Sequence, residues 1–320
     1  MPAVTGPGLR ITGWGTALPD KVVTNADLEA TLDTSDTWIV ERTGIRQRHI
    51  GGTTAGLAAE AGAAALARAG LTGADIDVVV LATSTPDQAM PGSSAHVHEL
   101  LGIRGGAFDV NAACSGFVYA LVVGAGLVAT GSRRVLVIGS DTMSRITDWD
   151  DRSTAILFAD GAGALVLEAT EGPGGLLSYD LGADGTSRGL LYAEVGGFML
   201  MEGRELFRRA VRAMVDSAQA CLAEAGVGVD QVSLLVPHQA NIRIIEAAAS
   251  RLGIDLDRAA TVLDRTGNTS AGSIPLALVD ALDHGRLAPG DLVLLCGFGA
   301  GMTTASALVR WDGTAPGAPS

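Results

Sequence analysis

A cysteine stands where a predicted strand runs into a predicted helix. Cys114 follows the β-prone run 107–110 and precedes a long apolar segment, 117–128, that is typical of a helix. The unpaired backbone N–H groups at a helix N-terminus favour a thiolate, so a nucleophilic thiol suits this place. Free cysteines are also among the most buried residues, so a purely structural role stays open on this evidence alone.

A nucleophilic thiol needs a partner that moves protons or stabilises charge, and His238 is the best placed of the five histidines. It directly follows an apolar strand pattern, and α/β folds place their sites at the carboxyl ends of strands. A plain helix-start role is the alternative. We expect His49 and His284 at the surface. His96 and His98 point to different faces of one predicted helix, so we expect no metal site there.

Two glycine-containing loops complete the candidate residues. The loop 266–273 carries Asn268, whose amide can donate a hydrogen bond beside His238, although Asn, Gly and Ser also supply ordinary turns and caps. The run 297–301, GFGAG, can bring backbone N–H groups close to a reacting carbonyl. It is not a dinucleotide fingerprint, because GxGxxG does not occur at a strand–helix junction.

The composition favours a large α/β protein. With 320 residues, 48% hydrophobic and 18% charged, the chain can bury a sizeable core. Three dispersed cysteines argue against a disulfide framework, and the first fifteen residues lack a signal-peptide pattern, so we expect a cytoplasmic location. The net charge of −13 argues against nucleic acid as a partner, and no apolar run is long enough to span a membrane.

Alternating strand and helix patterns must position these residues. Apolar runs predict strands over 9–15, 76–82, 107–110, 134–139, 232–236, 292–296 and 303–311. Helical periodicity, caps and closing glycines predict helices over 24–28, 36–41, 54–69, 93–101, 117–128, 203–225, 242–252 and 273–284. Segments 155–158 and 162–168 are predicted to form a hairpin around Asp160-Gly161.

The order of elements repeats at about half the chain length. Segment 65–82 resembles 221–237, and the pattern VLVIG…GAGALVLE resembles VLLCGFGAG…SALVRW at the end of the chain. Such a repeat indicates two similar α/β halves, each with a covered sheet. We therefore predict an N-terminal half, 1–172, that carries the cysteine, and a C-terminal half, 173–320, that carries the histidine and the asparagine.

Several motifs, in this order, resemble those of the β-ketoacyl-acyl-carrier-protein synthase III family of thiolase-like condensing enzymes. They run nearly end to end and comprise 33–50, 111–117, 150–164, 206–211, 237–245, 267–278 and the ending from 297 to 311. The resemblance implies a five-layer αβαβα fold and a homodimer. It also implies that the family's Cys-His-Asn triad falls on Cys114, His238 and Asn268.

The resemblance further implies a two-step reaction without a cofactor. An acyl-CoA primer acylates Cys114; malonyl-acyl carrier protein then loses CO2, and its carbanion attacks the thioester to start a fatty acid or polyketide chain. An acyltransferase of the same fold, which moves the acyl group to a hydroxyl or an amine, is the alternative. A catalytically silent subunit is disfavoured by the intact triad. A hydroxymethylglutaryl-CoA synthase would need a general-base carboxylate near the thiol, and the sequence places none.

The remaining roles are carried over from the family by position. Backbone N–H groups form the oxyanion hole, and Ala300 stands where relatives often have glycine, which leaves the backbone donor in place. The expected oxyanion-hole residues are Cys114, Gly299 and Ala300. The expected CoA-binding residues are Trp38, Arg42, Arg152 and Asn241. Carrier-protein docking is expected at Arg208, Arg243 and Arg251. Met90 is expected to wall the acyl pocket of the neighbouring subunit, where its adaptable side chain favours primers larger than acetyl.

Overall fold

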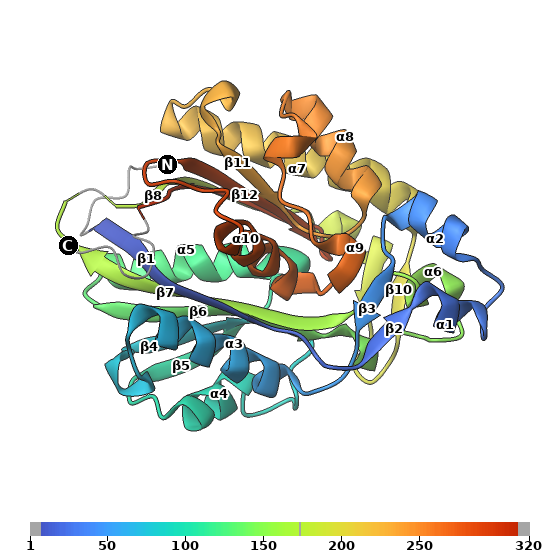
Figure 1. The fold of residues 1–320 in the computed structure, drawn as a ribbon, viewed down its shortest axis with the longest axis horizontal. Coiled ribbons are helices and arrows are strands. Elements are labelled where there is room, and N and C mark those ends of the chain that lie inside the picture. The colour runs from blue at the N-terminus through green and yellow to red at the C-terminus, as the bar shows by residue number, and fades with distance from the viewer. Residues whose placement is uncertain (1–7, 173, 313–320) are drawn as a thin grey trace.

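Two β-sheets and the helices on their faces form five layers (Figure 1). The computed structural model describes residues 8–172 and 174–312. Helices α3 (Thr54–Ala69) and α4 (Ser93–Leu101) cover the outer face of the first sheet. The order of layers confirms the predicted αβαβα architecture with two similar halves.

The other two helical layers belong to the middle and to the opposite face of the molecule. Helices α5 (Gly116–Ala129) and α10 (Ser273–Asp283) lie between the sheets. Helix α5 is apolar on nearly all sides because both sheets bury it. Helices α7 (Gly203–Ala225) and α8 (Ile242–Leu252) cover the second sheet and keep a polar outer face. Among the described residues, no helix is both long and apolar enough to cross a membrane.

The first sheet has the order β1-β7-β6-β4-β5, and the second has the order β11-β12-β13-β8. In the first, β4 is parallel to β5 and β6, whereas β7 is antiparallel to β1 and β6. In the second, β11 is parallel to β12, whereas β13 is antiparallel to β12 and β8. The strands are β1 (Gly8–Ala17), β4 (Val78–Ala82), β5 (Gly106–Val110), β6 (Arg134–Thr142), β7 (Asp160–Thr170), β8 (Leu176–Ala183), β11 (Leu234–Pro237), β12 (Leu292–Gly299) and β13 (Thr303–Arg310).

The repeat in the sequence is visible in the topology. The order β4-β6-β7-β1 corresponds to β11-β12-β13-β8, with the same parallel and antiparallel pairings. The halves also contact each other directly, since Trp14 packs edge-to-face on Trp311 with ring centroids 5.2 Å apart. The boundary at residues 172 and 173 stays a prediction.

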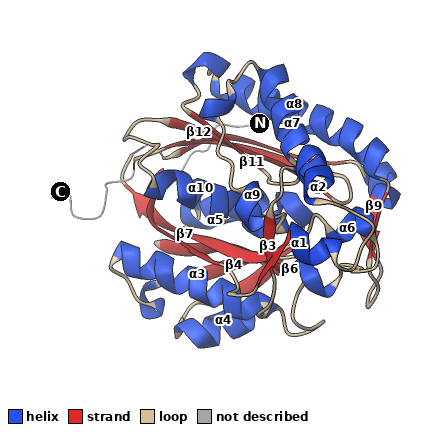
Figure 2. Cartoon of the chain, turned by 45° about the vertical axis from the view of Figure 1, so that its right-hand side comes forward, coloured by secondary structure: helices blue, strands red, loops and turns tan. Residues whose placement is uncertain are grey.

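Short elements collect at one end of the sandwich, beside the carboxyl ends of the parallel strands (Figure 2). They come from segments far apart in the sequence, which this end of the molecule brings together. The helices are α1 (Asn25–Glu29), α2 (Asp36–Thr43), α6 (Arg152–Ala155) and α9 (Leu263–Thr266). The strands form two small ladders, β2 (Val22–Thr24) with β3 (Gln47–His49) and β9 (Leu191–Ala193) with β10 (Met199–Met201).

The predicted hairpin around Asp160-Gly161 is wrong. Its second arm is strand β7, but its first arm is the end of α6 followed by a loop. That loop bonds to another part of the chain: the Asn268 N–H donates to the Leu157 carbonyl (2.9 Å), and the Ala159 N–H donates to the Asn268 carbonyl (2.9 Å). The sequence analysis also missed β8, β9 and β10. Strand β8 lies at a sheet edge and mixes polar with apolar residues, and β9 and β10 are three-residue strands of a small ladder.

The contact between β1 and α3 yields a stability prediction. A Cβ atom on Gly13 would lie 2.1 Å from the Ala65 carbonyl oxygen, so Gly13→Ala should push the helix from the sheet. We expect the free energy of unfolding to fall by about 1–3 kcal/mol. Gly126 lies exposed in α5 with no heavy atom near its added Cβ, so Gly126→Ala should raise stability by about 0.5–1 kcal/mol. Urea unfolding measures both, and equal effects would contradict the packing argument.

Candidate active site

A cavity of about 480 Å³ brings together the three residues singled out for chemistry. Cys114 lies in a 3₁₀ turn, Ala113–Ser115, between β5 and α5. His238 directly follows β11, and Asn268 lies just before a second 3₁₀ turn, Ser270–Gly272. Two of the residues thus follow strands at the end of the sandwich that carries the short elements, where α/β folds assemble their sites.

The backbone around Cys114 is held against the turn between β12 and β13. The Thr303 hydroxyl donates to the Ala112 carbonyl (2.8 Å) and accepts from the Ser115 hydroxyl (2.7 Å). A Cβ atom on Gly299 would lie 2.6 Å from the Cys114 backbone nitrogen, so only glycine fits there. The Cys114 amide therefore lies beside the residues expected to share the oxyanion hole, Gly299 and its neighbour Ala300. Their role as donors stays a prediction.

Burial dominates the acidity of Cys114. The residue is 6% exposed, and burial raises the pKa of its thiol to about 12. The Ser270 side chain and the backbone N–H of Cys114 act in the opposite direction, but they do not offset the burial. The thiol form therefore predominates at neutral pH, contrary to the thiolate expected from a helix N-terminus. The proton has to leave during the reaction itself.

His238 is held as a neutral donor. Burial lowers the pKa of its imidazole to about 3. Its Nδ1 lies 2.6 Å from the Ser273 hydroxyl, which also accepts the Gln239 N–H (3.3 Å). The hydroxyl proton is then available to Nδ1, and this hydrogen-bond pattern assigns the ring proton to Nε2. Phe298 packs edge-to-face on the ring at 5.4 Å and limits its rotation.

The amide of Asn268 is also oriented by a hydrogen bond. Its Oδ1 accepts the backbone N–H of Ser270 at 3.0 Å. This bond assigns the oxygen to the side of the turn and leaves the NH2 group as a donor on the other side. His238 and Asn268 thus provide two donors in the wall of the cavity that carries the thiol, and neither donor is negatively charged. Such a pair suits a reaction in which negative charge develops on oxygen.

The cavity has an apolar interior and an aromatic, basic mouth. The buried Leu157 and Leu191 line the interior, whereas the half-buried Trp38 and the exposed Arg42 line the mouth. The guanidinium carbon of Arg42 lies 4.3 Å from the centroid of the Trp38 ring, and that of Arg152 lies 4.7 Å from it. Arginines stacked on an aromatic ring suit a ligand with a planar group and negative charges at one end.

Asn241 lies at the same mouth, but its amide is already engaged. Its oxygen caps α8 by accepting the Arg243 N–H (2.9 Å), and its nitrogen donates to the Arg42 carbonyl (2.9 Å). The side chain therefore joins α2 to α8. Arg243 also lines the cavity, with its guanidinium carbon 5.6 Å from the Phe207 ring.

Six predicted site residues are not among those that line this cavity. Arg152 stacks on Trp38, and Gly299 and Ala300 directly follow Phe298, which does line the cavity.

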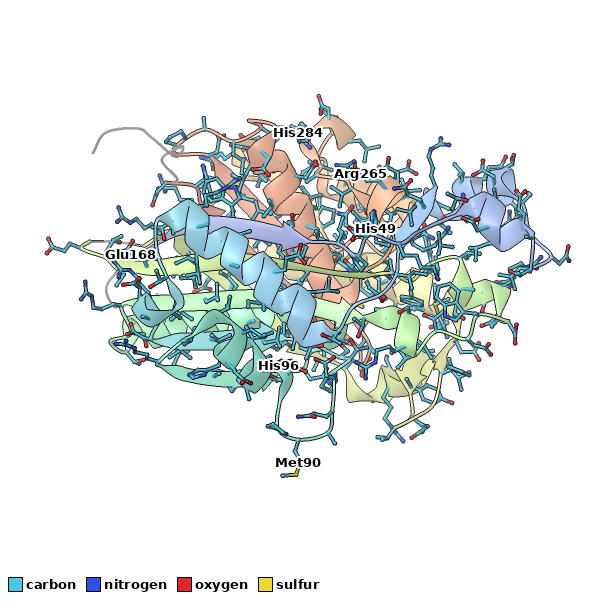
Figure 3. The ribbon with its side chains drawn as sticks, turned by 60° about the horizontal axis from the view of Figure 1, so that its bottom comes forward. His49, Met90, His96, Glu168, Arg265 and His284 are labelled. Carbon is cyan, nitrogen blue, oxygen red and sulfur yellow. The ribbon has the colours of Figure 1, made fainter. Side chains whose placement is uncertain are left out.

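The other three of these residues are Arg208, Arg251 and Met90. Arg208 is 76% exposed in its side chain and pairs with Glu205 at 2.8 Å. Arg251 is exposed in the last turn of α8. Met90 is 84% exposed at the tip of a loop that points away from the body of the molecule (Figure 3). Within one chain, Met90 does not reach the cavity that holds Cys114.

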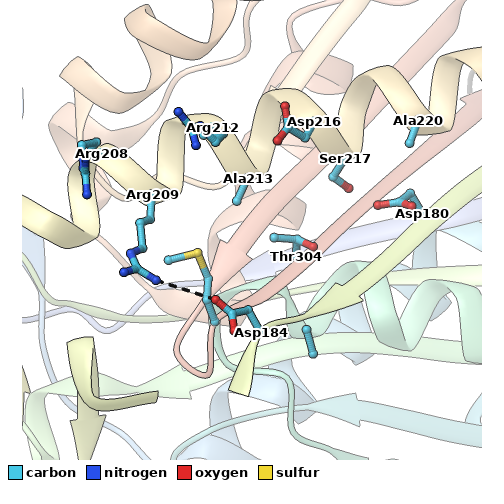
Figure 4. A pocket seen from close by; sticks show the side chains of 12 residues that line it. Asp180, Asp184, Arg208, Arg209, Arg212, Ala213, Asp216, Ser217, Ala220 and Thr304 are labelled. Carbon is cyan, nitrogen blue, oxygen red and sulfur yellow. Dashed lines mark ion pairs between the residues drawn. The ribbon is translucent and has the colours of Figure 1, made fainter. Parts of the chain in front are cut away.

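A larger cavity, of about 670 Å³, opens between α7 and the ends of β8 and β13 (Figure 4). Its lining mixes basic and acidic side chains, among them the ion pair between Arg209 and Asp184 at 3.8 Å. It contains none of the three residues singled out for chemistry. We therefore place the reaction in the smaller cavity despite the difference in volume.

The sequence analysis missed the residues that orient the site. Ser270 and Ser273 hold Asn268 and His238, and the buried carboxylate of Asp141 lies close enough to act on the Cys114 thiol. From the sequence alone, no carboxylate was expected near the thiol. The sequence did contain a signal, because an aspartate follows the apolar run in RVLVIGSD. A carboxylate buried there would need hydrogen-bond donors from other segments.

Comparisons with known proteins identify the relatives of this chain. A family model described as 3-oxoacyl-[acyl-carrier-protein] synthase III matches residues 108–185, and a model of the C-terminal part of the same enzyme matches residues 222–311. A β-ketoacyl-[acyl-carrier-protein] synthase III of Roseiflexus castenholzii is 50% identical, with 94% of this chain and 98% of that protein aligned. One from Sinorhizobium medicae is also 50% identical, with the same coverage of both chains.

Solved structures show the same fold over nearly the whole chain. The 3-oxoacyl-[acyl-carrier-protein] synthase III of Aquifex aeolicus superimposes with a TM-score of 0.93 at 42% identity, covering 95% of this chain and all of that one. The priming β-ketosynthase of the R1128 polyketide pathway gives a TM-score of 0.92 at 35% identity, covering 97% of this chain and 98% of that one.

The raised pKa of Cys114 predicts how its reactivity depends on pH. Because the thiolate fraction grows about tenfold per pH unit below the pKa, alkylation of Cys114 by iodoacetamide should accelerate steadily from pH 6 to 9.5 without a plateau. An ordinary thiol would level off above about pH 8.5. Peptide mass spectrometry separates Cys114 from the buried Cys221 and Cys296. A plateau below pH 8 would show that the site stores a thiolate.

Proposed function

The chain belongs to the 3-oxoacyl-[acyl-carrier-protein] synthase III family, and we propose that it condenses an acyl-CoA primer with malonyl-acyl carrier protein. The products are 3-oxoacyl-acyl carrier protein, CO2 and CoA, which would start a fatty acid or polyketide chain. The observation that carries this proposal is the pairing of two uncharged donors, His238 and Asn268, with a cysteine in one cavity. No cofactor is needed beyond the acyl-CoA substrate.

In the first step, the sulfur of Cys114 attacks the thioester carbonyl of the primer. The tetrahedral intermediate carries a negative oxygen, which the backbone N–H groups of Cys114 and of Gly299 or Ala300 stabilise. The C–S bond to CoA then breaks, and the thiol proton of Cys114 leaves with CoA as its thiol. The close approach of Gly299 to the Cys114 amide supports this assignment.

In the second step, the malonyl group loses CO2, and the remaining electron pair is delocalised onto the thioester oxygen. Nε2–H of His238 and the Asn268 amide donate hydrogen bonds to this enolate oxygen. A pKa of about 3 keeps His238 neutral at physiological pH, so no proton is delivered prematurely to the carbanion. The carbanion attacks the acyl group on Cys114, and the released sulfur takes up a proton, consistent with its raised pKa.

We propose that the mouth of the cavity binds the nucleotide part of CoA. Adenine would stack between Trp38 and Arg152, with Arg42 near the phosphates and Asn241 also in contact with CoA. Adenine needs a separation of about 3.5–4 Å from the group on each of its two faces. The guanidinium carbon of Arg152 lies 4.7 Å from the Trp38 centroid, which is too close for adenine to fit between them. Arg152 must therefore move away from Trp38 when adenine enters.

Charge and exposure support the proposed partners. Arg208, Arg243 and Arg251 are exposed basic side chains on a protein whose net charge is −13. Their local positive charge supports docking of an acidic carrier protein. The exposed Met90 supports a homodimer in which its side chain walls the partner's acyl pocket. The three cysteines are free thiols, which supports the proposed cytoplasmic location.

Separate assays of the two steps test the proposed roles. Cys114→Ala should abolish acylation by acyl-CoA, observed as a mass increase of the intact protein. His238→Ala and Asn268→Ala should remain acylated but slow CO2 release from malonyl-acyl carrier protein by about 100-fold or more, because each removes a donor from the enolate. The reverse order, with acylation more affected than decarboxylation, would contradict these roles. An ester or amide product in place of 3-oxoacyl-acyl carrier protein would instead indicate acyl transfer.

The proposed position of Met90 predicts the range of primers. The wild type should use primers larger than acetyl, and Met90→Phe should shift kcat/KM several-fold toward acetyl-CoA, because a rigid ring leaves less room than a thioether chain. Competition between acyl-CoAs of different length measures this shift. Gln88→Asn, on the same exposed loop, is the control and should leave the preference unchanged. A wild type that favours acetyl-CoA would overturn the prediction.

A further inference from the structure

Asp141 carries a buried carboxylate that the proposed chemistry does not use. It lies near the end of β6 and is 0% exposed. Its Oδ1 accepts hydrogen bonds from the Thr83 hydroxyl (2.9 Å), the Ser84 N–H (2.7 Å), and both the N–H (3.0 Å) and the hydroxyl (2.9 Å) of Thr85. Its Oδ2 accepts the Ala271 N–H at 2.9 Å. So many donors indicate that the group is held as an acceptor.

These bonds join two segments that meet at the active site. The four donors on Oδ1 belong to the loop after β4 in the first half of the chain. The donor on Oδ2 belongs to the 3₁₀ turn Ser270–Gly272, which directly follows Asn268 in the second half. The carboxylate is therefore a fixed point that ties this turn to the first sheet.

The turn is strained and needs such a tie. Ser270 has a φ of 51°, in the left-handed region that non-glycine residues rarely adopt. Its hydroxyl is buried without a hydrogen bond of normal geometry among the described residues, although it lies close to the Cys114 thiol and to Asp141. The same backbone geometry presents the Ser270 N–H to the Asn268 oxygen. Loss of the tie at Ala271 would allow the turn to relax and the Asn268 amide to rotate.

A role as general base does not fit this carboxylate. Burial raises the pKa of Asp141, but the donors around it leave little room for a substrate proton. It also does not line the cavity, so it acts through other groups.

We infer that Asp141 is a positioning residue, whose carboxylate holds the Ser270–Gly272 turn so that the Asn268 amide donates into the cavity. This inference rests on the proposed role of Asn268 in the malonyl step. It implies that Asp141 matters for decarboxylation and condensation more than for acylation of Cys114.

The substitution Asp141→Asn tests the inference. If the amide oxygen keeps the donors of the loop after β4, its NH2 group faces the Ala271 N–H, and the two donors repel each other. CO2 release by the pre-acylated enzyme should then slow by about 10- to 100-fold, as expected for a displacement of about 1 Å. Acylation of Cys114, followed by intact mass, should slow by less than about threefold, since the backbone donors near Gly299 are not touched. The charge of Asp141 raises the pKa of the thiol, so its loss favours the thiolate and does not slow this step.

Asp160→Asn is the matched control. Asp160 is also 0% exposed, lies on the neighbouring strand β7, and accepts hydrogen bonds from Gly51 and Ser144. Among the described residues, its carboxylate makes no hydrogen bond to the turn after Asn268, so its substitution should leave the ratio of the two step rates unchanged. Thr83→Val removes only one donor to Asp141 and provides a milder variant if Asp141→Asn folds poorly, with thermal unfolding as the check on each protein.

A double-mutant cycle separates positioning from general damage. In the Asn268→Ala background, Asp141→Asn should slow the malonyl step by less than about threefold, because the group it positions is already absent. Equal slowing in both backgrounds, or the same rate ratio for Asp141→Asn and Asp160→Asn, would overturn the inference. If Asn268→Ala alone leaves the malonyl step unaffected, the proposed function of Asn268 fails, and the two failures are thus distinguished.

Discussion

Burial at the junction of the two halves is the constraint on which the site depends. A thiol, an imidazole and an amide that are nearly inaccessible to water each need a defined set of partners, because an unpaired buried polar group is costly. Ser273 meets this need for His238, and the Ser270 N–H meets it for Asn268. The same bonds set the tautomer of the ring and the direction of the amide. Stability and chemical readiness therefore come from the same contacts.

The junction also explains why the protein is built from two sheets. Cys114 belongs to the first half, whereas His238 and Asn268 belong to the second. The strand-like bonds between Asn268 and the loop after α6 cross between the halves, as does the edge contact between Trp14 and Trp311. The site therefore exists only when both halves are docked in register. A change far from the cavity can affect the chemistry if it shifts one sheet against the other.

The sequence predicts the central sheets well and the peripheral elements poorly. The buried strands β4, β6, β11 and β12 show continuous apolar runs, and Gly70 and Gly226 mark helix ends, since both adopt the left-handed conformation. Strand β8 pairs with the distant strand β13, and the loop after α6 pairs with Asn268 in place of the predicted hairpin. A local sequence pattern does not record such pairing between distant segments. For the site, the motif resemblance singled out Cys114, His238 and Asn268, which one cavity brings together. The residues bonded around them, Ser273 and Asp141, lie in segments whose proximity only the fold reveals.

The place of Gly299 has a consequence for how such a protein can diverge. The Cys114 amide is a backbone group, and a Cβ atom on Gly299 would lie 2.6 Å from its nitrogen, so no residue with a side chain fits at position 299. The walls of the cavity are less constrained than the backbone beside Cys114, because Leu191 and Met201 lie in the small β9–β10 ladder outside both sheets. Substitutions there can accumulate without loss of the reacting groups. Substitutions in this ladder can therefore change the shape of the cavity while Cys114, His238 and Asn268 keep their positions.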